Sequence, residues 1–232
     1  MFEKVKNTHL DYWLGTSPDG LPVGNVRGLM IHQEWDDDFI EIIKKENIEF
    51  LNYSYYAECN IDFLEKLQGL GIRDVDIQVP TVKDLRPLVY IKDSLECLSL
   101  DTSFTQSPDF STFPNLWCVG LTWRTKAKSI LQSKTITQFG LEKHPFETME
   151  IFADMPQLES LFLSYGKLKS LKGIENLPNL RKLDIAFCRT LESLDGIQNA
   201  PKLTKEKTVV TKCKQITEDS PYAEYVTFND LY

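Results

Sequence analysis

One pattern of apolar and polar positions, apolar-x-x-apolar-x-apolar, recurs along most of the chain. Its copies begin at Val26, Ile48, Ile72, Leu95, Leu116, Ile136, Leu158 and Leu180. Successive copies are therefore 22, 24, 23, 21, 20, 22 and 22 residues apart. Alternating apolar residues predict short strands that are buried on one face. The spacing is too short for βαβ units, which need about 30 residues, and it predicts a stack of similar turns.

The segments between these copies predict how the chain returns to the next strand. Residues 36–46 begin with aspartates and carry two lysines near their end, which is the order that the helix dipole favours, so we expect a helix there. Residues 60–67 and 146–155 have a similar pattern. Residues 107–114 contain two prolines and favour an irregular or 3₁₀ segment. Because one turn cannot bury its own apolar face, neighbouring turns must stack.

The pattern resembles the leucine-rich-repeat family, with 22-residue-type repeats in the C-terminal half. Residues 158–180 are LESLFLSYGKLKSLKGIENLPNL and residues 180–203 are LRKLDIAFCRTLESLDGIQNAPKL. The resemblance covers about residues 26–203. It implies an α/β fold, a leucine-rich-repeat solenoid: a curved, horseshoe-like, right-handed superhelix with a parallel β-sheet on its concave face. Short helices, 3₁₀ turns and irregular segments are expected on the convex face.

The family places Asn or Cys three positions after the last strand leucine, where the side chain bonds to backbone groups of the turn. In this sequence only Cys188 fits that position; the other turns carry residues such as Pro80, His144 and Gly166. We therefore expect irregular turns.

Both ends of a solenoid need a cap. Residues 1–25 are interpreted as an N-terminal hairpin or extended cap, with a turn at 17–20 and Trp13 covering the end of the core. Residues 26–203 form the solenoid of about eight repeats. Residues 204–232 are interpreted as a C-terminal cap. The alternative is that its aromatic tail is a docking peptide; the tail contains Tyr222, Tyr225, Phe228 and Tyr232.

The strand residues between the buried positions are expected to face the concave surface and to bind a partner. Asp74, Asp76 and Asp101 lie on neighbouring strands and predict an acidic patch. Aromatic residues of the kind enriched at binding hot spots lie on or just after the strands: Phe50, Tyr55, Trp123, Phe162, Tyr165 and Phe187. Asp184 completes the candidate partner-binding set. The alternative for each aromatic residue is packing on the next turn.

Composition and charge exclude several functional classes of protein. The net charge of −8 and the pI near 5.0 argue against nucleic acid as a partner, because phosphate binding needs a basic patch. No apolar run approaches the roughly 20 residues that cross a membrane, and the N-terminus lacks a signal-peptide pattern. The five cysteines are odd in number and widely spaced, as in a reduced cytosolic protein. We expect a cytoplasmic monomer.

Candidate chemistry is sparse. Asp74 and Asp76 share one strand face and can hold a cation only weakly, since no histidine joins them in sequence. Cys97 and Cys118 occupy equivalent positions in neighbouring turns but lack further zinc ligands. The histidines have no spacing that assembles a nucleophile and a base, and the P-loop, GxSxG and GxGxxG patterns are absent. We therefore expect no catalysis, no cofactor and no metal.

These features predict a non-catalytic protein–protein interaction module that holds another protein, with basic and apolar surface, on its concave strand face. An adaptor role or an inhibitor role, such as an immunity protein for a toxin, is an expectation by fold-level analogy. One alternative is a structural protein that self-associates. A more remote one is an enzyme or small-ligand binder, which would need a deep pocket.

Overall fold

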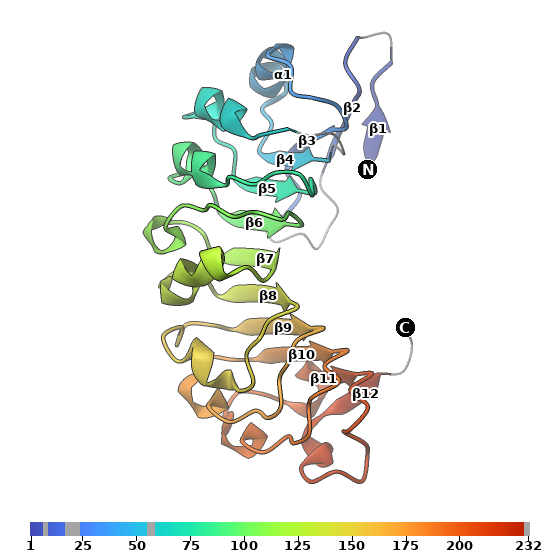
Figure 1. Ribbon diagram of the computed structural model, residues 1–232. Helices are drawn as coiled ribbons and strands as arrows, with labels where there is room; N and C mark the ends of the chain where they lie inside the picture. Colours follow the sequence, from blue (N-terminus) through green and yellow to red (C-terminus); the bar gives the residue numbers. More distant parts are fainter. Residues whose placement is uncertain (7–8, 17–23, 55–58, 230–232) are drawn as a thin grey trace. The chain divides into compact units, whose positions relative to one another are not determined.

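The computed structural model describes residues 1–6, 9–16, 24–54 and 59–229 (Figure 1). Tyr55, Tyr232 and the turn expected at 17–20 lie outside these residues. The chain divides into two compact units, Met1–Cys118 (unit 1) and Val119–Tyr232 (unit 2).

Unit 1 begins with two antiparallel strand pairs and continues with parallel ones. Its strands are β1 (Phe2–Lys4), β2 (Tyr12–Thr16), β3 (Arg27–Ile31), β4 (Phe50–Tyr53), β5 (Asp74–Ile77) and β6 (Cys97–Leu100). β2 pairs antiparallel with both β1 and β3, and β3 to β6 pair in parallel. The chain returns through α1 (Asp38–Glu46) and the 3₁₀ segments η1 (Asp62–Leu67), η2 (Arg86–Ile91) and η3 (Phe110–Thr112).

Unit 2 is a stack of parallel strands joined by 3₁₀ segments. Its strands are β7 (Cys118–Thr122, whose first residue closes unit 1), β8 (Gln138–Glu142), β9 (Ser160–Ser164), β10 (Lys182–Ala186), β11 (Thr208–Thr211) and β12 (Thr227–Asn229). β8 to β12 pair in parallel in chain order. The 3₁₀ segments are η4 (Thr125–Gln132), η5 (Met149–Phe152), η6 (Ile174–Asn176), η7 (Ile197–Asn199), η8 (Lys205–Lys207) and η9 (Ala223–Tyr225).

The return segments lie where the sequence predicted them, but most are 3₁₀ segments rather than α-helices. The helix expected at 36–46 is α1. The segments expected to be helical at 60–67 and 146–155 form the 3₁₀ segments η1 and η5 instead. A 3₁₀ helix rises about 2.0 Å per residue against about 1.5 Å for an α-helix, so it spans the return with fewer residues. That suits a repeat of only 20 to 24 residues.

The core consists of the apolar positions of the repeat. In all eight copies the leading apolar residue and the two strand residues that follow are buried, at most 8% exposed. Leu158, Leu161 and Leu163 are each 0% exposed. The strands lie on one side of each unit and the helical segments on the other, with these side chains between them (Figure 1).

Parallel pairing continues past Leu203, where the sequence placed the start of a C-terminal cap. β11 pairs with β10 and β12 pairs with β11, in the register Ala186↔Thr211↔Asn229. Val210 and Val226 are buried in this region. The end of unit 2 therefore contains two further strands of the same sheet.

The N-terminal hairpin covers the core with a different residue from the one expected. Tyr12 is buried and meets the ring of Phe39 edge-on, with centroids 5.8 Å apart. Trp13 is only half-buried and lies against the ring of His32, at 4.3 Å. Successive residues of a strand point to opposite faces, so Tyr12 and Trp13 cannot both cover the core.

We expect Leu161→Ala to lower the free energy of unfolding by about 2–5 kcal/mol, because it leaves a cavity between stacked turns. The matched control is Phe162→Ala on the same strand, whose side chain is 40% exposed. It should cost less than about 1.5 kcal/mol, since little of the removed surface is buried. Urea unfolding followed by circular dichroism measures both. Equal losses at the two positions would contradict the assignment of the core.

Candidate binding surface

Unit 2 contains a pocket on its strand face that brings together three of the predicted binding residues. Phe162 on β9, Asp184 on β10 and Phe187 just after β10 line a cavity of about 450 Å³. The remaining lining residues are Ile185, Ala186, Val209, Thr211 and Asn229. A volume of this size is typical of ligand pockets, which are mostly apolar with a few polar groups. Register explains the grouping, since Phe162 is opposite Asp184 and Asp184 is opposite Val209.

The chain leaves four successive strands of unit 2 through residues in the left-handed region of backbone space. We call them the left-handed row: Lys143 (φ 53°), Tyr165 (φ 52°), Phe187 (φ 56°) and Lys212 (φ 50°). The N–H groups of the first three donate to Ser164, Ala186 and Thr211, at 2.9, 3.1 and 2.9 Å. Each acceptor directly precedes the next member of the row. These bonds extend the hydrogen-bond ladder between neighbouring strands by one residue.

These four positions favour glycine or asparagine on backbone grounds. A bulky side chain in the left-handed region costs about 1 kcal/mol or more. Burial does not offset that cost at Tyr165, which is 54% exposed, and Lys143 and Lys212 are also exposed. The row thus keeps large side chains at the surface against the preference of its own backbone.

The aromatic members of the row form one flat apolar surface. The rings of Tyr165 and Phe187 stack with centroids 4.7 Å apart and planes 1° apart. The ammonium of Lys212 lies 5.7 Å from the centre of the Phe187 ring, within the range of a cation–π contact. Below the stack, Asp184 is ion-paired with Lys182, whose Nζ lies 3.2 Å from its Oδ2. Phe162, Tyr165, Asp184 and Phe187 therefore lie on one continuous surface.

Trp123 follows β7 and packs on the next turn. It is half-buried, and its ring meets Phe146 edge-on at 4.8 Å. This is the alternative that the sequence left open for each aromatic residue.

In unit 1 the expected binding residues are largely covered. Phe50 is only 7% exposed because Phe2 on β1 lies edge-on against it, with centroids 6.0 Å apart, so the expectation of an exposed aromatic side chain was wrong. Tyr55 lies outside the described residues. Asp101, at the end of β6, is exposed as expected.

The expected acidic patch is mostly buried. Asp74 is 5% exposed, and burial, reinforced by the charge of Asp76, raises its pKa to about 7. Burial also raises the pKa of Asp76, although Asn52 and Gln78 each donate a hydrogen bond of 2.8 Å to it. An exposed acidic patch was therefore a wrong prediction. Asp74 lies between Phe50 and Cys97 on the neighbouring strands, which shield it from water.

The other reactive side chains of this face are thiols. Cys97 and Cys118 are adjacent, as their equivalent repeat positions predict, and both are free thiols. The hydrogen bond of Cys97 to Cys118, together with burial, raises the pKa of Cys97.

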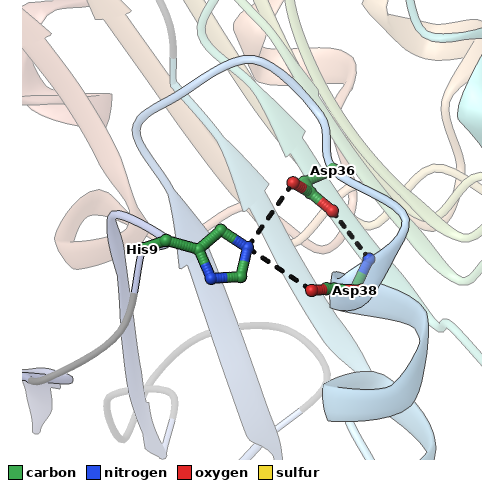
Figure 2. A group of neighbouring side chains, drawn as sticks. All are labelled: His9, Asp36 and Asp38. Atoms are coloured by element: carbon green, nitrogen blue, oxygen red, sulfur yellow. Dashed lines mark hydrogen bonds and ion pairs between the residues drawn. The ribbon is translucent and has the colours of Figure 1, made fainter.

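A cluster that the sequence did not indicate lies at the start of α1 (Figure 2). The Nε2 atom of His9 is 3.4 Å from Asp38 Oδ2 and 3.7 Å from Asp36 Oδ2, and Asp36 also accepts the backbone N–H of Asp38. The three ligand atoms lie within 4.8 Å of one another. All three side chains are at least 40% exposed, so water competes for each of them. We describe the cluster as an ion pair at a helix N-terminus, where carboxylates are favoured. No local motif indicates it, because His9 and Asp36 are 27 residues apart.

Comparison with known families supports the repeat assignment. Residues 156–199 match the family model described as Leucine Rich repeats (2 copies). The match spans β9, η6, β10 and η7 of unit 2. Residues 156–199 therefore contain two leucine-rich repeats. No curated protein matches it.

The turn position at which leucine-rich repeats place Asn or Cys has other side chains in most turns of unit 2. His144, Cys188 and Cys213 are all buried there, at most 4% exposed. Gly166 occupies the same position between His144 and Cys188, and a Cβ atom on Gly166 would overlap the imidazole of His144. The hydrogen bond of Cys213 to Cys188, together with burial, raises the pKa of Cys213. An imidazole and two thiols therefore fill these buried turn positions, and the sequence pattern alone indicated only Cys188.

The buried carboxyl of Asp74 should make the stability of unit 1 depend on pH. Its pKa of about 7 lies above the ordinary value of 3.8, so the folded protein holds this proton more tightly than the unfolded chain. The free energy of unfolding should therefore fall as pH rises from about 4 to about 7, and level off above that. The fall amounts to at most about 4 kcal/mol, since each pKa unit corresponds to about 1.4 kcal/mol.

Asp74→Asn should reduce this pH dependence and exceed the wild type in stability at pH 8, as measured by urea unfolding across the pH range. The control is Asp101→Asn, because Asp101 is exposed. If both variants show the wild-type pH dependence, Asp74 is not a buried proton-binding group.

The left-handed backbone at Tyr165 predicts how glycine and alanine at this position affect stability. Tyr165→Gly should be more stable than Tyr165→Ala by about 1 kcal/mol, because only glycine adopts positive φ without cost. At Phe162, inside a strand, the order should reverse, since glycine weakens a strand by about 0.5–1 kcal/mol relative to alanine. Urea midpoints of the four variants give the comparison. If the alanine variant has the higher urea midpoint at both positions, the left-handed row has no backbone cost.

Proposed function

We propose that this protein is a non-catalytic binding module that holds a protein partner on the strand face of unit 2, at the left-handed row and the pocket beside it. Leucine-rich repeats generally mediate protein–protein interactions. The observation that carries the placement is the row itself. Its large side chains occupy positions that disfavour them, and three of the four, Lys143, Tyr165 and Lys212, are exposed rather than buried.

Backbone strain that packing does not require is characteristic of functional surfaces. Tyr165, Phe187 and the two lysines supply contact area and charge that glycine or asparagine cannot supply. A partner that contacts these side chains would offset the backbone cost in the complex. Selection for binding thus accounts for residues that stability alone disfavours.

The surroundings of the row have the composition of a binding hot spot. Hot spots place aromatic side chains and an apolar pocket at the centre, with polar groups around them. Phe162, Phe187 and Val209 supply the apolar centre, and Asp184, Thr211 and Asn229 supply polar groups at its edge. Tyr165 adds an exposed ring beside the pocket through its stack on Phe187.

A catalytic role has less support from the described residues. Unit 2 has two thiols and an imidazole that could act as nucleophiles or as a base. They belong to Cys188, Cys213 and His144, and all three are buried at the turns, where a substrate does not reach them. We therefore infer that binding alone is the activity. A partner held on this face has that part of its surface covered, which suits an inhibitor or an adaptor.

Two observations bear on where the protein works. None of the helices among the described residues is long and apolar enough to cross a membrane. All five cysteines are free thiols. Free thiols are typical of a reducing compartment, so we infer a cytoplasmic location.

Affinity capture from native lysate tests the proposal with the double variant Tyr165→Gly/Phe187→Gly. Glycine suits the backbone at both positions, so the substitutions add no backbone strain to unit 2. Each hot-spot side chain contributes about 2 kcal/mol or more, so capture of the partner should fall at least about tenfold.

The control is Tyr225→Ala on η9, which removes an aromatic side chain of similar exposure (42%) from the same unit. It should capture the partner like the wild type. The proposed surface is wrong if the double variant retains the partner and Tyr225→Ala loses it, or if both retain it equally.

A further inference from the structure

The two units differ in net charge, and this difference indicates which charge a partner of unit 2 would carry. Residues 1–118 contain ten Lys and Arg against 20 Asp and Glu, a formal net charge of −10. Residues 119–232 contain 16 against 14, a formal net charge of +2. The surface proposed for binding therefore belongs to the unit that does not share the acidic character of the whole chain.

The charges of the left-handed row have a definite order. Lys143 and Lys212 are its outer members, and the stacked Tyr165 and Phe187 lie between them. Both lysines are exposed, and within the described part of the chain neither forms an ion pair with a carboxylate. The surface thus presents an aromatic centre with an available ammonium group at each end.

The pocket itself has no available negative charge among its described lining residues. Asp184 is the only carboxylate there, and Lys182 neutralises it at 3.2 Å. The Lys212 ammonium lies over Phe187, which is also a pocket wall. A basic side chain of a partner would meet like charge at this pocket, whereas an apolar side chain flanked by carboxylates would find complementary groups.

We propose that the left-handed row and its pocket bind an acidic peptide segment of a protein partner, which places a large apolar side chain in the pocket and carboxylates beside Lys143 and Lys212. This inference rests on the proposed function and specifies the chemistry of the partner. It replaces the expectation of a basic partner, which was based on Asp74, Asp76 and Asp101, because Asp74 is buried and Asp76 is half-buried in unit 1, so that only Asp101 of the three is exposed.

The spacing of the row also sets the spacing of the carboxylates. Lys143 and Lys212 lie three strand intervals apart, and neighbouring strands are about 4.8 Å apart, so the two positions are about 14 Å from each other. An extended peptide advances about 3.3 Å per residue. Carboxylates four or five residues apart, with the apolar residue between them, fit the row.

Four pools of synthetic peptides, each about nine residues long, test this chemistry. The first has Phe, Leu or Trp at the centre and Asp or Glu on both sides at the predicted spacing. The second replaces the acids with Lys, the third replaces them with Ser, and the fourth keeps the acids and replaces the centre with Ala. Binding to the full chain is measured by fluorescence polarisation at low and at high salt.

The acidic pool with an apolar centre should bind at least about tenfold more tightly than the Lys pool and the Ala-centred pool. An exposed ion pair contributes about 1.4- to fivefold in affinity, so Lys143→Glu/Lys212→Glu should weaken the acidic pool by about two- to 25-fold. The same variant should gain affinity for the Lys pool, a gain that a misfolded protein would not show. High salt should weaken the preferred pool, because the contacts are charged and exposed.

Other outcomes overturn the inference and separate it from the proposed function. If the Lys or Ser pool binds as tightly as the acidic pool, and Tyr165→Gly/Phe187→Gly abolishes that binding, the charge assignment is wrong while the binding surface stands. If no pool binds to protein that still captures its partner through the row, the partner is not an acidic peptide.

Discussion

The rest of the structure depends on one constraint, which is that a single turn of this chain cannot bury its own apolar side chains. Each repeat of 20 to 24 residues supplies three strand-side apolar residues and a few more from its return segment, and these are covered only by the turns on either side. Stacking requires every strand to pair with the next in the same direction. It also requires every return segment to be short, which favours 3₁₀ segments over full helices.

The same constraint creates the candidate binding surface. The chain leaves four parallel strands of unit 2 in the left-handed conformation, and at Lys143, Tyr165 and Phe187 the N–H there also donates a hydrogen bond to the next strand. Unit 2 therefore repeats a backbone position that favours glycine. Unit 2 fills that position with lysine and aromatic side chains. On the strand face of unit 1, by contrast, Phe2 covers Phe50 and the carboxyl of Asp74 is buried.

Periodicity predicted the features that depend on apolar spacing, and missed those that depend on contacts between distant segments. All eight copies of the pattern and the position of α1 follow from residue type and spacing. The burial of Phe50 requires knowing that the ring of Phe2 on β1 packs against it, and His9 meets Asp36 and Asp38 although their segments share no motif. β11 and β12 were not counted as repeats because the copy that begins at Leu203 continues into the polar residues 204–208, although Val210 is buried like Ile185 opposite it. Phe162, Tyr165, Asp184 and Phe187 were selected for their place on or just after the strands. The left-handed backbone of Tyr165 and Phe187, and the pocket that Phe162, Asp184 and Phe187 share, were not visible in the sequence.

The central claim is that the left-handed row of unit 2 contacts a protein partner. Site-specific photo-crosslinking tests it most directly, with a photoreactive phenylalanine analogue placed at Tyr165, and at Lys128 on η4 as a comparison on the helical side of the same unit. The partner should become covalently attached from position 165 and not from position 128. Attachment from position 128 alone would show that the partner contacts the opposite side of unit 2 and would contradict the account.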